Sequence, residues 1–79
     1  MKTLVMMDVK NGKKIEYQLK DIKEIVTDKA KNLFHKNDLE NNGIKPNTVI
    51  TIIYFNDGEY FKEGEQATFE AINWKMLFE

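Results

Sequence analysis

The sequence contains no arginine, no cysteine and no serine, so all twelve of its cationic residues are lysines. Without cysteine and serine the chain has no thiol or serine nucleophile, no disulfide bond and no thiolate metal site. Without arginine it has no arginine finger and no bidentate arginine contact to guanine. The chain also has only one histidine, His35. We therefore expect a protein that is not an enzyme.

Long apolar runs are also missing, since the longest, Leu4–Met7 and Ile52–Phe55, have four residues each. A membrane-spanning helix needs about 20 apolar residues, and a signal peptide needs a stretch of about 7–15. We expect no membrane association and a cytoplasmic location. Lys, Ile and Asn, whose codons are rich in A and T, are abundant. This favours a source in a low-GC bacterium or in a phage or mobile element that it carries.

The residues that are present describe an ordinary globular chain, with 42% hydrophobic residues, 32% charged residues and a net charge of -1. The periodicity of the apolar residues alternates between two and about 3.6. We predict a small single domain of the α+β class, in the order ββαβββ, with a mostly antiparallel sheet and one amphipathic helix on one face. The predicted parts are an N-terminal hairpin 2–19, a helix at about 21–36, a connection 37–47 and a C-terminal meander 48–78, which together make one compact domain 1–79.

The first hairpin is predicted from Asn11-Gly12, a dipeptide typical of two-residue type I′ turns. A two-residue loop pairs Met6 with Tyr17 and Leu4 with Leu19, which places these apolar residues on one face. The first strand is apolar on both faces, as in an inner strand. The second alternates apolar and polar residues, as in an edge strand.

The segment 20–36 has apolar residues at helical spacing, and Asp21 with Glu24 three residues on matches a capping pair at its start. An alternative helix begins after Thr27 as N-cap and ends near Glu40. Gly43, in the connection after the helix, is free to adopt a left-handed conformation. The apolar positions of the stripe are Ile22, Ile25, Val26, Ala30, Leu33 and Phe34.

The C-terminal part begins with Thr48–Phe55, which is apolar on both faces and therefore predicted to be a central strand. A turn at Asp57-Gly58 pairs Tyr54 with Phe61. A second turn at Gly64-Glu65 then places Tyr60 opposite Phe69. Beyond Ala71 the alternation slips by one residue, which indicates a bulge or a strand that crosses to another layer.

No group of residues has the spacing of a catalytic or metal site. His35 lacks a nucleophile or carboxylate at a diagnostic distance along the chain. Asp38, Glu40, Asn42 and Gly43 match the start of a calcium-binding EF-hand loop, but Val49 stands where the bidentate glutamate is needed. We expect no catalytic residue, no metal, no cofactor and no small-molecule ligand.

A partner is suggested by the apolar residues, because one helix covers one face of a sheet and the meander has two apolar faces. Large exposed apolar patches usually mark interaction sites. The leading hypothesis is a non-catalytic binding or regulatory module that contacts a partner protein or itself, a homodimer included. The residues predicted to contact the partner are Tyr54, Tyr60, Phe61 and Trp74.

The alternative hypothesis is single-stranded nucleic-acid binding, with Tyr54, Tyr60 and Phe61 stacking on bases and lysines contacting phosphates. The net charge of -1 and the absence of arginine argue against it. For Trp74, with Met76 and Phe78, a place in the core and a place in an interface both stay open.

Overall fold

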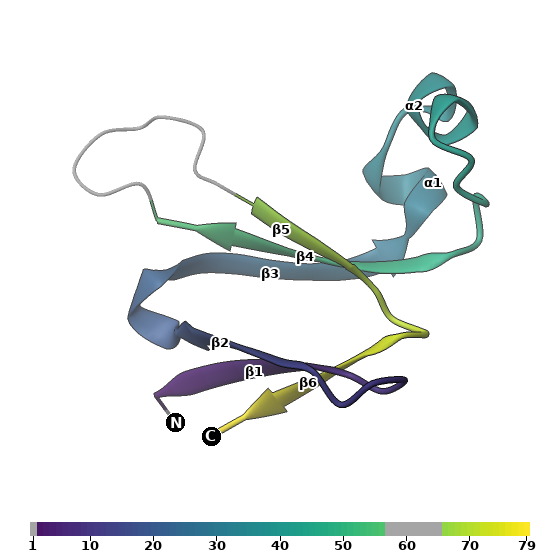
Figure 1. Ribbon diagram of the computed structural model, residues 1–79. Helices are drawn as coiled ribbons and strands as arrows, with labels where there is room; N and C mark the ends of the chain where they lie inside the picture. The colour runs from purple at the N-terminus through teal and green to yellow at the C-terminus, as the bar shows by residue number, and fades with distance from the viewer. Residues whose placement is uncertain (1, 57–65) are drawn as a thin grey trace.

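The computed structural model describes residues 2–56 and 66–79, which form two antiparallel three-stranded sheets and short helices (Figure 1). Sheet A has the strand order β2-β1-β6, and sheet B has the order β3-β4-β5. The α+β class is confirmed, but the prediction of one amphipathic helix on one sheet is wrong. The elements are β1 Thr3–Asp8, β2 Lys14–Gln18, the 3-10 helix η1 Leu19–Asp21, β3 Ile22–Lys29, α1 Ala30–Leu33, α2 Lys36–Asn41, β4 Val49–Phe55, β5 Gln66–Glu70 and β6 Trp74–Phe78.

The β1–β2 hairpin has the predicted faces but a register shifted by two residues, with Leu4 opposite Tyr17 and Met6 opposite Ile15. The shift arises because the loop between Asp8 and Lys13 has four residues instead of two, closed by an Asp8 N–H to Lys13 O bond of 2.7 Å. Gly12 in this loop has φ +72°. A shift of two residues leaves every side chain on its predicted face. The inner position of β1 and the edge position of β2 are confirmed.

Half of the segment predicted as a helix at 21–36 is strand β3, and its helical residues lie only before and after this strand. A bulge explains the error, because the register passes from Ile22 opposite Phe55 to Ile25 opposite Ile53. Three residues of β3 therefore span two of β4, which puts Ile22 and Ile25 on one face at a helix-like spacing. Glu24 lies in the strand and does not form the predicted capping pair.

The helical residues lie further along the chain, nearer to the alternative that begins after Thr27, although Thr27 itself is in β3. α2 occupies part of the segment predicted as an irregular connection. It ends in a Schellman motif, in which Ile44 N–H donates to Leu39 O at 2.9 Å and Gly43 N–H donates to Glu40 O at 3.3 Å. Gly43 has φ +65°, which confirms its predicted left-handed conformation.

Strand β4 is the centre of sheet B, as predicted, but its neighbours differ from the prediction. Tyr54 lies between Glu24 of β3 and Gln66 of β5, and Phe61, its predicted partner, is outside the described residues. Residues 57–65, including Tyr60, are outside the described residues. After β5 the chain crosses to sheet A and becomes β6, which pairs with β1. This crossing explains the slip in alternation beyond Ala71, one of the two outcomes expected.

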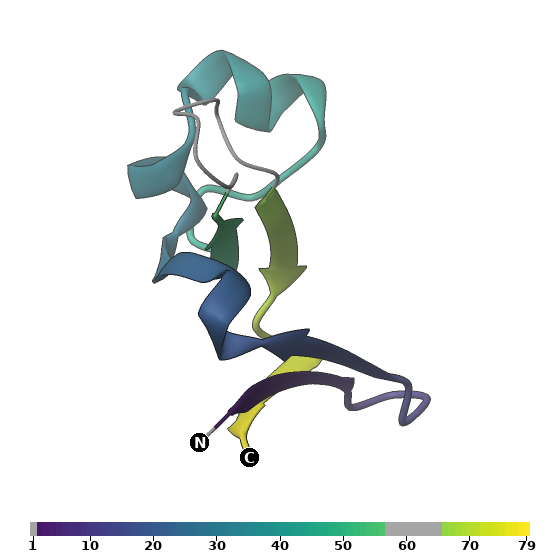
Figure 2. The same cartoon turned by 90° about the vertical axis from the view of Figure 1, so that its left-hand side faces the viewer.

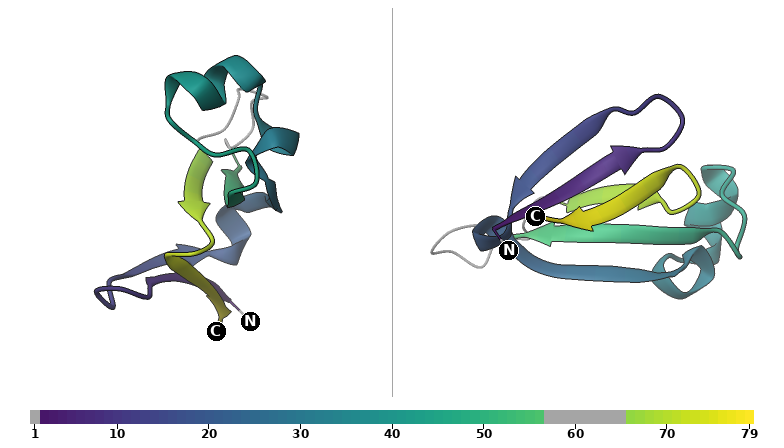
Figure 3. Two further views of the ribbon diagram at one scale, coloured as in Figure 1. Left: turned by 90° about the vertical axis from the view of Figure 1, so that its right-hand side faces the viewer. Right: turned by 90° about the horizontal axis from the view of Figure 1, so that it is seen from below.

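The core has two parts, one on each face of β4. Leu4 and Met6 of sheet A pack against Ile53 and Phe69 of sheet B, while the other face of β4 packs against the helical segment. In Figure 2 sheet B stands upright and sheet A extends away beneath it, and Figure 3 gives the same arrangement from two further sides. The second part of the core consists of Ala30, Leu39, Ile50 and Ile52.

Candidate protein-contact surface

The groups considered for catalysis lie on the surface and do not converge. His35 is exposed and immediately precedes α2, rather than following a long helix. Asp38 and Glu40 belong to α2, so they do not form the loop that calcium binding requires. In residues 2–56 and 66–79, no three or more potential ligands lie together as a metal site would need. Within the same residues, no helix is long and apolar enough to cross a membrane.

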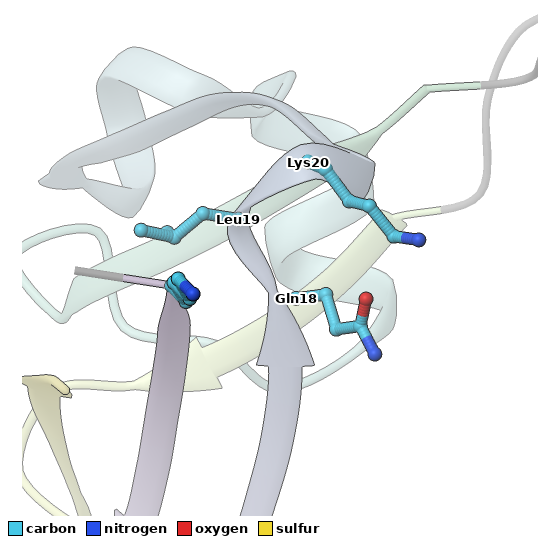
Figure 4. A pocket seen from close by; sticks show the side chains of 4 residues that line it. Gln18, Leu19 and Lys20 are labelled. Atoms are coloured by element: carbon cyan, nitrogen blue, oxygen red, sulfur yellow. The ribbon is translucent and has the colours of Figure 1, made fainter.

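A pocket of about 300 Å³ lies where β2 ends, lined by Lys2, Gln18, Leu19 and Lys20 (Figure 4). The two lysines and the glutamine are exposed. Figure 4 shows the Gln18 and Lys20 side chains on the side opposite to that of Leu19. A small-molecule site usually encloses its ligand and directs several polar groups toward it. This pocket does neither, so we assign it no ligand.

The predicted contact residues are not brought together. Tyr54 packs against the cluster formed by the helices and β4, and Trp74 packs between the two sheets. These positions are on opposite faces of sheet B, so the two side chains cannot form one surface. Tyr60 and Phe61 are outside the described residues. Trp74 is partly buried and packs against the core cluster between the sheets.

Trp74 belongs to an aromatic cluster that joins the sheets. Its ring centroid lies 4.8 Å from that of Phe69, and Tyr17 lies 6.5 Å from Phe69 and 5.1 Å from Phe55. Such tilted and edge-to-face pairs stabilise the fold beyond the free energy gained by burying the rings. Burial of the Tyr17 phenol raises its pKa above the usual value of 10.0. The cluster therefore stabilises the contact between the sheets.

The apolar surplus that suggested a partner is largely covered within the chain. One face of β4 contacts sheet A and the other contacts the helical segment, so neither needs a second molecule. The two apolar faces of β4 therefore do not indicate a partner. Among the described residues, exposed apolar side chains lie elsewhere.

An apolar surface lies at the end of sheet A, where Met76 and Phe78 of β6 are 38% and 47% exposed. They pair with Met6 and Leu4 of β1, which are 1% and 0% exposed. Because opposed residues share a face, Met76 and Phe78 continue the apolar inner face of sheet A beyond the area that sheet B covers. We call Met76 and Phe78, with the backbone of β6, the β6 edge surface.

Among the residues that the structure describes, the backbone of β6 is paired on the side of β1 and on no other side. Thr3 and Glu79 exchange two hydrogen bonds of 2.9 Å, and Val9 N–H donates to Asn73 O at 2.9 Å. In an antiparallel ladder these directions alternate along the strand. The N–H and C=O groups of Met76 and Phe78 therefore point outward. In the part of the chain that the structure describes, no strand pairs with this side of β6.

The other edges of the sheets are better protected against pairing. β2 and β5 carry charged or polar side chains at alternate positions, and β3 contains a bulge. Charged side chains and bulges both discourage pairing with another strand. Sequence reasoning grouped Met76 and Phe78 with Trp74, because all three follow one alternation. Only the incomplete overlap of the two sheets separates the buried residue from the exposed ones.

Comparison with known proteins gives no relative: no family model, no curated protein and no solved structure matches this chain.

The alternative hypothesis of nucleic-acid binding stays a prediction. Of its stacking residues, Tyr54 packs against the helical cluster and is only half-exposed. A stacking platform needs aromatic faces open to solvent. No specific arrangement of the described residues favours this function over protein contact.

Proposed function

We propose that this chain is a small non-catalytic binding module that acts through protein–protein contact, with the β6 edge surface as the contact. The observation that carries the proposal is the exposure of Met76 and Phe78 beside the buried residues Leu4 and Met6. Exposed apolar side chains that continue a core face lose contact with water when a partner covers them, which favours association. Methionine and phenylalanine are also enriched in interfaces.

The free backbone of β6 supports the same proposal. An exposed edge strand offers a row of donors and acceptors to an extended segment of another chain. The hydrogen bonds then give affinity, and the pockets beside alternate side chains give specificity. In β6 both features occur on one strand, since the residues with outward N–H and C=O groups are also those with exposed apolar side chains.

The experiment compares proteins captured from a lysate of the source cells by the wild-type chain and by the double variant Met76→Thr/Phe78→Thr. Threonine keeps the preference for strand conformation while removing most of the apolar surface. Ile72→Thr is the matched control, because Ile72 is 79% exposed but lies in the turn before β6. Circular dichroism first verifies that all three chains are folded.

We expect the wild type and Ile72→Thr to retain the same protein, identified by mass spectrometry. The double variant should retain at least about tenfold less, as for truncation of central interface residues. Equal retention by the double variant would contradict the proposed function, as would a wild-type chain that retains nothing and also stays monomeric at high concentration.

A further inference from the structure

We propose that the partner of the β6 edge surface is a second copy of this chain. In this dimer the two β6 strands pair antiparallel, and the two A sheets join into one six-stranded sheet. The inference rests on the proposed function and names the occupant of its surface. It is carried by the backbone directions of β6 and by the order of its side chains.

The backbone directions allow a two-fold axis that passes beside Leu77. In this register Met76 of each copy lies opposite Phe78 of the other, and Leu77 lies opposite its own counterpart. Met76 and Phe78 have outward N–H and C=O groups, so each of these two pairs can exchange two hydrogen bonds. Leu77 directs its backbone groups toward β1 and occupies the non-hydrogen-bonded position, as the alternation requires.

The side chains of β6 are complementary to themselves in this register. Lys75 of each copy lies opposite Glu79 of the other, which gives two pairs of opposite charge. On the inner face, Met76 lies opposite Phe78, and a thioether beside an aromatic ring is a favourable contact. An axis beside Met76 also satisfies the backbone, but it places Lys75 opposite Leu77. Charge therefore selects the axis beside Leu77.

The apolar inner face of sheet A becomes continuous in the dimer. Each copy contributes Leu4 and Met6 beside Phe78 and Met76. The second copy therefore adds to an existing core face. A two-fold pairing uses the same strand twice and closes at two copies. The contact spans one short strand, and small interfaces of this kind belong to weak, transient associations. We expect a reversible monomer–dimer equilibrium.

The test is sedimentation equilibrium of the full chain over concentrations up to about 1 mM at low salt. The mass should rise with concentration from 9.3 kDa toward twice that value. The variants Lys75→Glu and Glu79→Lys each place like charges opposite one another and should each weaken dimerisation about tenfold. The double variant Lys75→Glu/Glu79→Lys restores opposite charges and should dimerise like the wild type.

An equimolar mixture of the two single variants gives the sharpest result. Lys75→Glu leaves one chain acidic at both positions, and Glu79→Lys leaves the other basic at both, so the mixed dimer has two favourable pairs. We expect the mixture to dimerise at least as tightly as the wild type. Lys14→Glu on the opposite edge of sheet A is the control and should dimerise like the wild type.

Failure of the mixture to recover association would overturn the inferred dimer, as would species larger than two copies. A strict monomer would also overturn it. If that monomer still captures another protein in dependence on Met76 and Phe78, the proposed function stands and only the second copy is wrong. If it captures nothing, both proposals fail.

Discussion

At the scale of single residues, the pairing of Thr27 with Thr51 links β3 to β4 through side chains as well as through the backbone. Their Oγ1 atoms lie 2.9 Å apart across the β3–β4 ladder. Thr51 is 6% exposed, and a buried hydroxyl without a partner is costly. In a helix at 21–36, nothing would have linked these two residues. The pair is therefore a specific mark of β3.

We predict a coupling free energy of about 0.5–1.5 kcal/mol between Thr27 and Thr51. Thr27→Val alone leaves the buried Thr51 hydroxyl without a partner, whereas Thr27→Val/Thr51→Val leaves no hydroxyl to satisfy. Urea unfolding of the wild type, the two single variants and the double variant measures the coupling. Additive effects would show that the two hydroxyls do not interact.

Tyr17 provides a second test at this scale, through pH. Burial favours the neutral phenol and raises its pKa above 10.0 in the folded chain. The folded state therefore holds this proton more tightly than the unfolded state. Its contribution to stability is complete below the unfolded pKa and is lost as pH rises toward the folded pKa.

We expect the difference in phenolate absorbance between the wild type and Tyr17→Phe to titrate with a midpoint above pH 10.0. The free energy of unfolding of the wild type should fall over the same range relative to that of Tyr17→Phe. A midpoint at or below the usual value would mean that Tyr17 is solvated, contrary to its place between the sheets.

At the scale of elements, the sequence predicts strands well and the segment 21–36 poorly. The alternation of apolar and polar residues identifies β1, β2 and β4 and their buried faces. An error of two residues in the length of the β1–β2 loop does not change which face a side chain occupies. In β3 the bulge imitated the spacing of a helix. The β-branched residues Ile25, Val26 and Thr27 favour a strand, and this is the signal that could have corrected the prediction.

For the candidate surface, the strand β6 could be predicted from the sequence, but the exposure of its side chains could not. The apolar alternation of β6 was visible, and the crossing between layers was one of two expected outcomes. Whether Trp74 or Phe78 becomes buried depends on where sheet B ends above sheet A. That overlap is set by contacts between residues far apart in the chain, such as Phe69 with Trp74. No local pattern contains this information.

A substitution at Gly43 tests the Schellman motif that ends α2. Its φ of +65° lies in the left-handed region, where a Cβ atom costs about 1–2 kcal/mol. A Cβ there would meet no other atom within 4 Å, so strain of the backbone is the whole effect. We predict that Gly43→Ala lowers the free energy of unfolding by about 1 kcal/mol. Asn41→Ala, within α2, is the control.

Thermal and urea unfolding of both variants measure this effect. Asn41→Ala should leave stability nearly unchanged or raise it slightly, because alanine favours the helix. An equal effect of the two substitutions would argue against the Schellman motif, since only Gly43 requires the left-handed conformation.

At the scale of the whole molecule, the small thickness of the chain explains why part of sheet A is exposed. The principal extents are 35 × 35 × 16 Å, and the radius of gyration is 13.6 Å. A compact domain of this length has a radius of gyration of about 11.6 Å. Two sheets that meet at an angle and overlap only in part leave the end of sheet A uncovered. The β6 edge surface follows from this shape.

This shape makes a concentration-dependent association the central expectation for the molecule. In the single chain, the amides of Lys75 and Leu77 donate to β1, while those of Met76 and Phe78 face solvent. Covering β6 with a second copy would change only the second pair. Exchange of the Lys75 and Leu77 amides therefore reports on the fold, and exchange of the Met76 and Phe78 amides reports on the contact between two copies.

The pairing of β6 with a second copy is tested by amide hydrogen exchange of β6, measured by NMR at about 10 μM and about 1 mM. We predict that Lys75 and Leu77 are protected at both concentrations. The amides of Met76 and Phe78 should exchange rapidly at the lower concentration and several-fold more slowly at the higher one. Rapid exchange of Met76 and Phe78 at both concentrations would contradict the pairing of two β6 strands.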